Sequence, residues 1–103
     1  MRASVEFYRD VLGMKVVYGG ENAAFTSLCM RKADSPVLNL EHGPTITGWG
    51  RLIFHVAEVD SLWKHLRNLG FEPEQPQDAS WGERYFHMHD PDGHELSFAR
   101  PLE

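Results

Sequence analysis

The sequence predicts an α+β fold made of two related β-α-β-β-β units, the first of which lacks its opening strand. An internal repeat carries this prediction. Two helical patterns end at equivalent pairs, Leu12-Gly13 and Leu69-Gly70, and each is followed by short β-like segments separated by turn residues. The chain has 103 residues, which suits one small domain with a single core. We assign residues 1–42 to the first unit, 43–49 to a linker and 50–103 to the second unit.

In the first unit, residues 3–12 predict a helix that Gly13 ends as a left-handed cap. The apolar positions at helical spacing are Val5, Tyr8, Val11 and Leu12. Strands are expected at residues 14–18, 23–30 and 37–41, separated by Gly-rich or polar breaks. In the second unit a strand precedes the helix, at residues 51–56. Its counterpart in the first unit falls before Met1, and its absence leaves the strands at 37–41 and 51–56 each without one neighbour.

The second unit continues with a helix at residues 61–69, which Asp60 or Ser61 is expected to cap. Its predicted buried stripe consists of Leu62, Leu66 and Leu69, and Gly70 ends it. A short strand is expected to start at Phe71-Glu72, and the segment PEQPQDAS that follows is expected to form a loop.

Residues 81–101 predict a hairpin with one apolar and one polar face. Pro91 presets φ at the second turn position, Asp92 is tolerated at the third, and Gly93 supplies a positive φ. Alternation gathers apolar residues on one face of the arms: Phe86, Met88, Leu96 and Phe98. The other face has the composition of a site: Glu83, Tyr85, His87, His89, Glu95 and Ser97.

The charge balance argues against nucleic-acid and membrane partners. Net charge is −5 and no basic stripe is present, whereas phosphate binding requires clustered Lys and Arg. No apolar run is long enough to span a bilayer, and no signal-peptide pattern opens the chain.

The single Cys29 excludes an internal disulfide framework and is expected to be a small buried residue in a strand. We therefore expect a cytoplasmic protein.

Two stretches carry a family resemblance: FYRDVLGMKVVY at residues 7–18 and WGERYFHMHDPDGHELSFA at residues 81–99. Together with the paired units, they resemble the vicinal oxygen chelate superfamily, which includes glyoxalase I, fosfomycin-resistance enzymes, extradiol dioxygenases and bleomycin-resistance proteins. The resemblance covers almost the whole chain. It implies a glyoxalase-like cleft between the sheets of two units, often within a dimer, where enzymatic members hold a divalent metal.

The resemblance places metal ligands on the first and last strands of each unit. In the second unit these positions are Arg51 and Ser97, and by the repeat the last-strand position of the first unit is Asn39. Arg cannot be deprotonated, and divalent cations prefer carboxylate or imidazole ligands. We therefore expect no metal cofactor. A displaced site for Zn, Ni, Mn or Fe, using His55 and Glu95 with a neighbour such as His87, is the alternative.

The predicted cleft-lining residues are Asn39, Glu41, Trp49, Arg51, Ile53, His55, Trp81, Tyr85, His87, Glu95 and Ser97. Within this set, Arg51 either clamps a ligand carboxylate or phosphate, or forms a salt bridge with Glu41 or Glu95. The tryptophans and Tyr85 offer ring faces that suit planar or cationic ligands, with core or dimer packing as the competing explanation.

We expect a metal-independent protein of the bleomycin-resistance type that sequesters a small cationic aromatic molecule as a homodimer. One alternative is a metal-dependent lyase, isomerase or dioxygenase of the glyoxalase type, in which Glu41 would move protons. Another is a degenerate domain with a role in assembly only. The unpaired strands predict strand exchange or addition by a partner chain, or a native start upstream of Met1.

Overall fold

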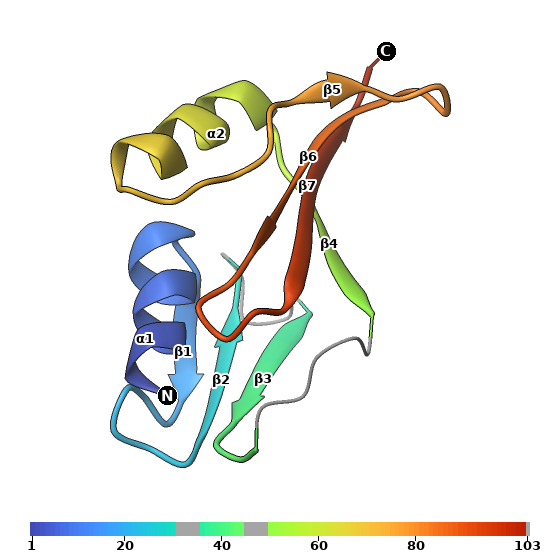
Figure 1. Ribbon diagram of the computed structural model, residues 1–103. Helices are drawn as coiled ribbons and strands as arrows, with labels where there is room; N and C mark the ends of the chain where they lie inside the picture. The colour runs from blue at the N-terminus through green and yellow to red at the C-terminus, as the bar shows by residue number, and fades with distance from the viewer. Residues whose placement is uncertain (31–35, 45–49, 103) are drawn as a thin grey trace. The chain divides into compact units, whose positions relative to one another are not determined.

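The computed structural model describes residues 1–30, 36–44 and 50–102 (Figure 1). The chain forms two compact units, residues 1–46 and 47–103, and their boundary lies within the range 43–49. Each unit carries its own helix and its own β-sheet, so the protein has the α+β fold of two related units. Trp49, one of the predicted site residues, lies outside the described residues.

The first unit contains a helix followed by a three-stranded sheet. Its elements are α1 (Arg2–Val5), the π-helix η1 (Glu6–Val11), β1 (Lys15–Tyr18), β2 (Phe25–Cys29) and β3 (Val37–Glu41). The strands are antiparallel in the order β1-β2-β3, which leaves β3 at a sheet edge. Within the described residues, α1 is the first element and begins at Arg2.

The first core differs from the predicted stripe because the helix changes type. Val5, Phe7 and Tyr8 are almost completely buried, while Val11 and Leu12 are only half-buried. A π-helix closes hydrogen bonds from residue i to i+5 and is therefore wound more widely than the α-helix that the spacing assumed. The wider winding changes the direction in which successive side chains point, and Phe7 lies on the buried side of the helix. Its ring meets the ring of Tyr8 edge-on, with centroids 5.1 Å apart.

The second unit is a complete β-α-β-β-β unit. Its elements are β4 (Arg51–His55), α2 (Val59–Asn68), β5 (Gln77–Asp78), β6 (Glu83–His89) and β7 (Glu95–Pro101). The strand order is β4-β7-β6-β5, with β4 parallel to β7 and the other pairs antiparallel. Across the described residues, no helix is long and apolar enough to cross a membrane.

The core of the second unit lies between its sheet and α2. Phe98 stacks on Phe54 at 5.4 Å and meets Phe86 at 5.2 Å, and Leu66 of α2 is fully buried. The prediction for Leu69 was wrong, because this residue is 52% exposed. It follows the last residue of α2, where the chain leaves the helical path that would have carried its side chain to the sheet.

The start of α2 also differs from the prediction. The helix begins at Val59 with Glu58 as its N-cap residue, rather than with Asp60 or Ser61. The Asp60 carboxylate instead accepts a hydrogen bond from Arg84 of β6 at 3.0 Å. It therefore ties the first turn of α2 to the sheet.

The end of α2 at Gly70 was predicted correctly, but the strand expected to start at Phe71-Glu72 is absent from the structure. Gly70 has φ of 95°, and the backbone N–H of Phe71 donates to the carbonyl of Leu66 at 3.1 Å. This bond uses Phe71 to close the helix, so no strand forms at Phe71–Glu72. The short strand β5 forms later, where Gln77 pairs with Tyr85.

The turn between β6 and β7 has the predicted chemistry. Gly93 has φ of 90°, and its backbone N–H donates to the carbonyl of Asp90 at 2.9 Å. The buried Asp90 carboxylate accepts from the backbone N–H groups of Asp92 and His94, each at 2.9 Å. The turn therefore fixes the register that sorts the arms into an apolar and a polar face. The prediction that Cys29 is buried is also confirmed.

Candidate functional site

The outer face of the second sheet, meaning the face turned away from α2, gathers most of the predicted site residues. Arg84, on the opposite face, bonds to Asp60 of α2, so the alternate positions of β6 point outward. The outward positions are Arg51, Ile53 and His55 on β4, Glu95, Ser97 and Ala99 on β7, and Glu83, Tyr85, His87 and His89 on β6. Seven of the eleven predicted site residues lie among them.

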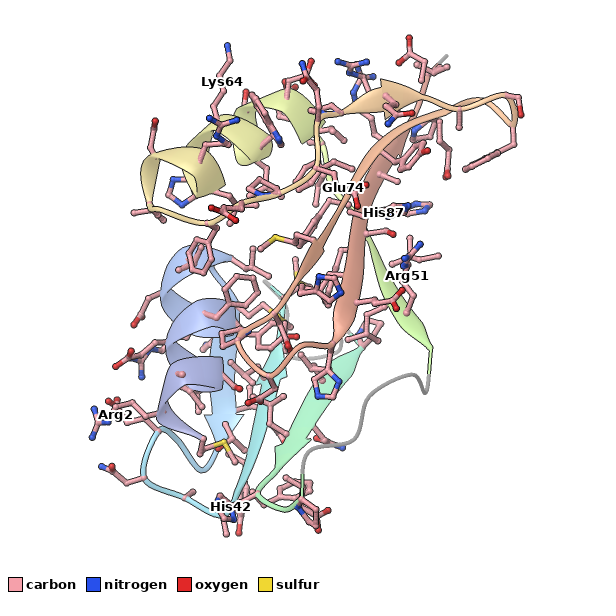
Figure 2. The ribbon with its side chains drawn as sticks, viewed as in Figure 1. Arg2, His42, Arg51, Lys64, Glu74 and His87 are labelled. Carbon is pink, nitrogen blue, oxygen red and sulfur yellow. The ribbon has the colours of Figure 1, made fainter. Side chains whose placement is uncertain are left out.

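A chain of polar contacts crosses this face at the start of β4. Nη2 of Arg51 donates to Oε1 of Glu95 at 2.6 Å, and Nη1 lies 3.2 Å from Nε2 of His87. Nδ1 of His87 lies 2.7 Å from Oγ of Ser97. Figure 2 shows Arg51 and His87 beside each other on this sheet. The salt bridge that was one of the two expectations for Arg51 is therefore present, with Glu95 as its partner.

The surroundings of His87 favour its neutral form. Partial burial is the main cause that lowers the pKa of His87, and the charge of Arg51 lowers it further. The carboxylates of Glu74 and Glu95 act in the opposite direction. Glu74 also lies beside β6, where its backbone N–H donates to the carbonyl of His87 at 2.9 Å.

These residues do not fit a divalent metal. The two positions at which the family resemblance would place ligands, Arg51 and Ser97, hold a guanidinium and a hydroxyl that contact His87 instead. Both ring nitrogens of His87 are engaged, so neither lone pair is available to a cation without breaking the chain. In the described parts of the protein, no group of three or more His, Cys, Asp or Glu residues is placed to hold a metal ion.

A second bridge crosses β7 at the other end of the face. Nε2 of His55 on β4 lies 3.5 Å from Oε2 of Glu83 on β6. His55 and Glu95, the pair considered for a displaced metal site, are not brought together. Glu95 pairs with Arg51, which lies four residues from His55, roughly 13 Å along β4. Glu83 is the partner of His55; alternation placed Glu83 on the polar face of the hairpin but did not identify it as the partner of His55.

Aromatic rings form a row along β6. Trp81 stacks on Tyr85 with ring centroids 5.6 Å apart, and the rings of Tyr85 and His87 are 4.9 Å apart. The indole N–H of Trp81 donates to Oε1 of Glu83 at 3.0 Å. Trp81 is 67% exposed, while Tyr85 and His87 are half-buried, so the row is open to solvent mainly at its Trp81 end. A ring row that ends beside a carboxylate can take up a planar group and a positive charge together.

Two predicted site residues, Asn39 and Glu41, lie on β3 of the first unit. Oγ of Ser27 donates to Oδ1 of Asn39 at 2.7 Å, and Glu41 is exposed. The same sheet exposes two aromatic residues that were not among the predicted site residues, Tyr18 at 66% and Phe25 at 38%, with centroids 6.3 Å apart. Both lie in predicted strands, and no motif in the residues around them marked them as part of a site.

The first unit also has a depression of about 550 Å³ next to its helix. It is lined by Arg9, Val16 and residues 19–23. None of the predicted site residues lines it. Its charges are already paired, because Arg9 contacts Asp10 at 2.7 Å and Glu21 at 3.0 Å. This ion pairing holds the pKa of Asp10 below its ordinary value and fastens the loop to the helix.

Comparisons with solved structures give consistent matches over both units. A lactoylglutathione lyase from Agrobacterium tumefaciens matches with a TM-score of 0.74 at 21% identity, over 95% of this chain and 83% of that chain. An antibiotic-binding protein from Streptomyces sp. CB03234 matches with a TM-score of 0.76 at 21% identity, over 96% and 84%. A bleomycin resistance determinant encoded on transposon Tn5 matches with a TM-score of 0.74 at 18% identity, over 97% and 88%. At these identities the likeness establishes the fold.

The sequence itself identifies the family. A search of curated proteins gave no match. The family model described as Glyoxalase/Bleomycin resistance protein/Dioxygenase superfamily matches residues 1–98, nearly the whole chain. This match agrees with the resemblance carried by residues 7–18 and 81–99. The chain is thus a member of the Glyoxalase/Bleomycin resistance protein/Dioxygenase superfamily.

Proposed function

We propose that the protein binds a small, planar, positively charged organic molecule on the outer face of its second sheet, without using a metal ion. The observation that carries this proposal is the ring row Trp81–Tyr85–His87, exposed at Trp81, with the Glu83 carboxylate at its Trp81 end. Binding without chemistry is the simplest use of such a surface, because its described residues offer ring faces and hydrogen-bonding groups to a ligand.

The ring row supports a planar ligand. Aromatic pairs prefer offset stacking, and a planar molecule that extends the Trp81–Tyr85 stack would bury indole surface that is now open to water. The ring faces carry negative partial charge, so a cationic ring gains an additional electrostatic attraction of roughly 0.5–2 kcal/mol.

The charges of this face support a cation. Arg51 is paired with Glu95 at 2.6 Å, so its charge is largely balanced within the protein. Glu83 has only His55 as a basic neighbour within the described residues, and that imidazole is charged only when it is protonated. A cationic ligand beside Glu83 would supply the missing positive charge.

The hydrogen bonds of His87 support binding without a metal. A divalent ion would have to displace Arg51 from Nε2 and approach within a few ångströms of a permanent positive charge. Two relatives with the same fold point to the same class of function. One is named an antibiotic-binding protein and the other a bleomycin resistance determinant.

A homodimer is a further part of this proposal. The edge strands β3 and β4 each carry a row of backbone groups without a partner strand within the described residues. Strand exchange or strand addition by a second copy would satisfy these groups. Sedimentation velocity at increasing protein concentration tests this part, and a monomer over the whole range would contradict it.

The ligand class can be tested with two planar probes of opposite charge, N-methylquinolinium and naphthalenesulfonate. The cation is expected to bind saturably and the anion to bind at least several-fold more weakly, as measured by tryptophan quenching and amide chemical shifts. Trp81→Ala should weaken cation binding about tenfold because it removes the exposed stacking surface. Glu83→Gln should reduce the preference for the cation.

Trp63→Phe is the matched control, because Trp63 lies on α2, where its indole N–H donates to the carbonyl of Pro73. It should leave both affinities unchanged. The proposal is wrong if the cation shows no saturable binding, or if Trp81→Ala and Trp63→Phe have equal effects.

A further inference from the structure

The direction of each hydrogen bond in the Arg51–His87–Ser97 chain follows from the chemistry of arginine. A guanidinium has only donors, so Nη1 of Arg51 must donate to Nε2 of His87 across their 3.2 Å contact. Nε2 therefore carries no proton. The proton of neutral His87 is on Nδ1, and it is donated to Oγ of Ser97 at 2.7 Å.

This assignment leaves the hydroxyl proton of Ser97 unused. Within the described residues, His87 is the only hydrogen-bond partner that the structure gives to Oγ of Ser97, and there the oxygen acts as acceptor. Ser97 is only 5% exposed, so its donor has little access to bulk water. Ser27 in the first sheet shows the contrasting arrangement, because its hydroxyl already donates a hydrogen bond to Oδ1 of Asn39.

Buried donors in proteins normally have a partner, and the hydroxyl proton of a serine can rotate toward whichever acceptor is offered. We infer that Ser97 donates a hydrogen bond to a ligand, and that the ligand class is a planar organic cation carrying a neutral carbonyl-type acceptor beside its ring. This inference rests on the proposed function and deepens it by naming a second recognition group.

The position of Ser97 specifies where the acceptor lies. Ser97 pairs directly with His87 of β6, and Tyr85 is the next outward residue along that strand. A ligand stacked on the row would therefore place its acceptor next to the ring, within reach of the middle of β7.

The acceptor is expected to be neutral rather than anionic. Glu74 and Glu95 exert their charge on the His87 position, and Glu83 lies on the same face. A ligand carboxylate would be repelled by these groups, and the charge of Arg51 is already paired with Glu95. A carboxamide or a similar carbonyl accepts the hydrogen bond without this repulsion.

Two probes that differ only in the acceptor test the inference: N-methylquinolinium and its carboxamide derivative. The wild-type protein is expected to bind the carboxamide about three- to tenfold more tightly, the usual effect of one neutral hydrogen bond. Ser97→Ala should bring this ratio close to one while still binding both cations. Ser97→Thr keeps the hydroxyl and should retain the preference.

Ser61→Ala is the matched control, because Ser61 lies on α2, on the opposite side of the sheet. It should leave the ratio as in the wild-type protein. The inference is overturned if the wild-type protein shows no preference, or if Ser97→Ala retains it, and in either case saturable binding of both cations leaves the proposed function standing. If neither cation binds, the proposed function and the inference both fail.

Discussion

Arg51 and His87 come from strands that are separated by β7, yet Nη1 of Arg51 lies 3.2 Å from Nε2 of His87. The contact requires a neutral imidazole, because a protonated His87 would present an N–H to another N–H. It therefore couples the geometry of the outer face to the protonation of one residue.

The first prediction concerns stability and pH. Partial burial and the charge of Arg51 lower the pKa of His87 in the folded protein, so the unfolded chain takes up this proton first as the pH falls. The contribution of neutral His87 to stability is therefore full above about pH 6.5, the ordinary imidazole value, and is lost as the pH falls toward the lower folded value. Urea unfolding should show that the difference in free energy of unfolding between the wild-type protein and His87→Gln becomes smaller as the pH falls through this range. A constant difference would contradict this.

The second prediction concerns the pKa of His87 itself. Arg51→Met removes a positive charge that lowers this pKa and frees Glu95, whose charge raises it. The pKa of His87 should therefore rise, as measured by titration of its ring signals with NMR. Arg100→Met is the control, since Arg100 pairs with Arg84 on the opposite face of the sheet. An unchanged pKa in Arg51→Met would show that the contact does not persist in solution.

The third prediction concerns the core. Phe98 is 1% exposed and lies between the rings of Phe54 and Phe86. Phe98→Ala should reduce the free energy of unfolding by about 3–5 kcal/mol, because it removes apolar contacts and leaves a cavity. Phe98→Leu should cost less and provides a folded variant for comparison. Phe25→Ala, at a 38% exposed position, should cost far less than Phe98→Ala, and equal losses in chemical denaturation would argue against this core.

The hairpin at residues 81–101 shows which structural features could be predicted from the sequence. Its turn and its two faces followed from Gly93 and from alternation, because both depend on local backbone geometry. The end of α2 could be predicted for the same reason, because it depends on the positive φ of Gly70. The inward rotation of Phe7 could not be predicted, because a π-helix differs from an α-helix by one residue per hydrogen-bonded ring and leaves no clear pattern.

Side-chain partners were harder to predict than faces. The sequence placed Arg51, His87 and Ser97 in one cleft but could not show that they form a continuous chain. Ser97 lies directly opposite His87, whereas the contact between Arg51 and His87 runs diagonally across β7. Likewise, His55 contacts Glu83 rather than Glu95. This pairing depends on the register of β4 relative to β6, which are separated by β7. Registers between distant strands are not encoded in spacing alone.

The fourth prediction concerns ligand binding in acid. Protonation of His87 adds a positive charge to the end of the ring row and breaks its contact with Arg51. Because the pKa of His87 is lowered in the folded protein, binding of N-methylquinolinium should weaken only at a pH below the ordinary imidazole value of about 6.5. Calorimetric titration of the wild-type protein between neutral and mildly acidic pH measures this. In His87→Gln the part of the decrease that depends on His87 should be absent, and an identical decrease would assign the effect to other groups.

We propose that the outer face of the second sheet holds a planar cation without a metal. The most direct test of this proposal is titration of N-methylquinolinium into protein purified without chelators, compared with protein dialysed against EDTA, with metal content measured by mass spectrometry. We predict equal affinities and no stoichiometric metal in either sample. A stoichiometric divalent metal that disappears in His87→Ala or His55→Ala, together with binding that requires it, would contradict the claim.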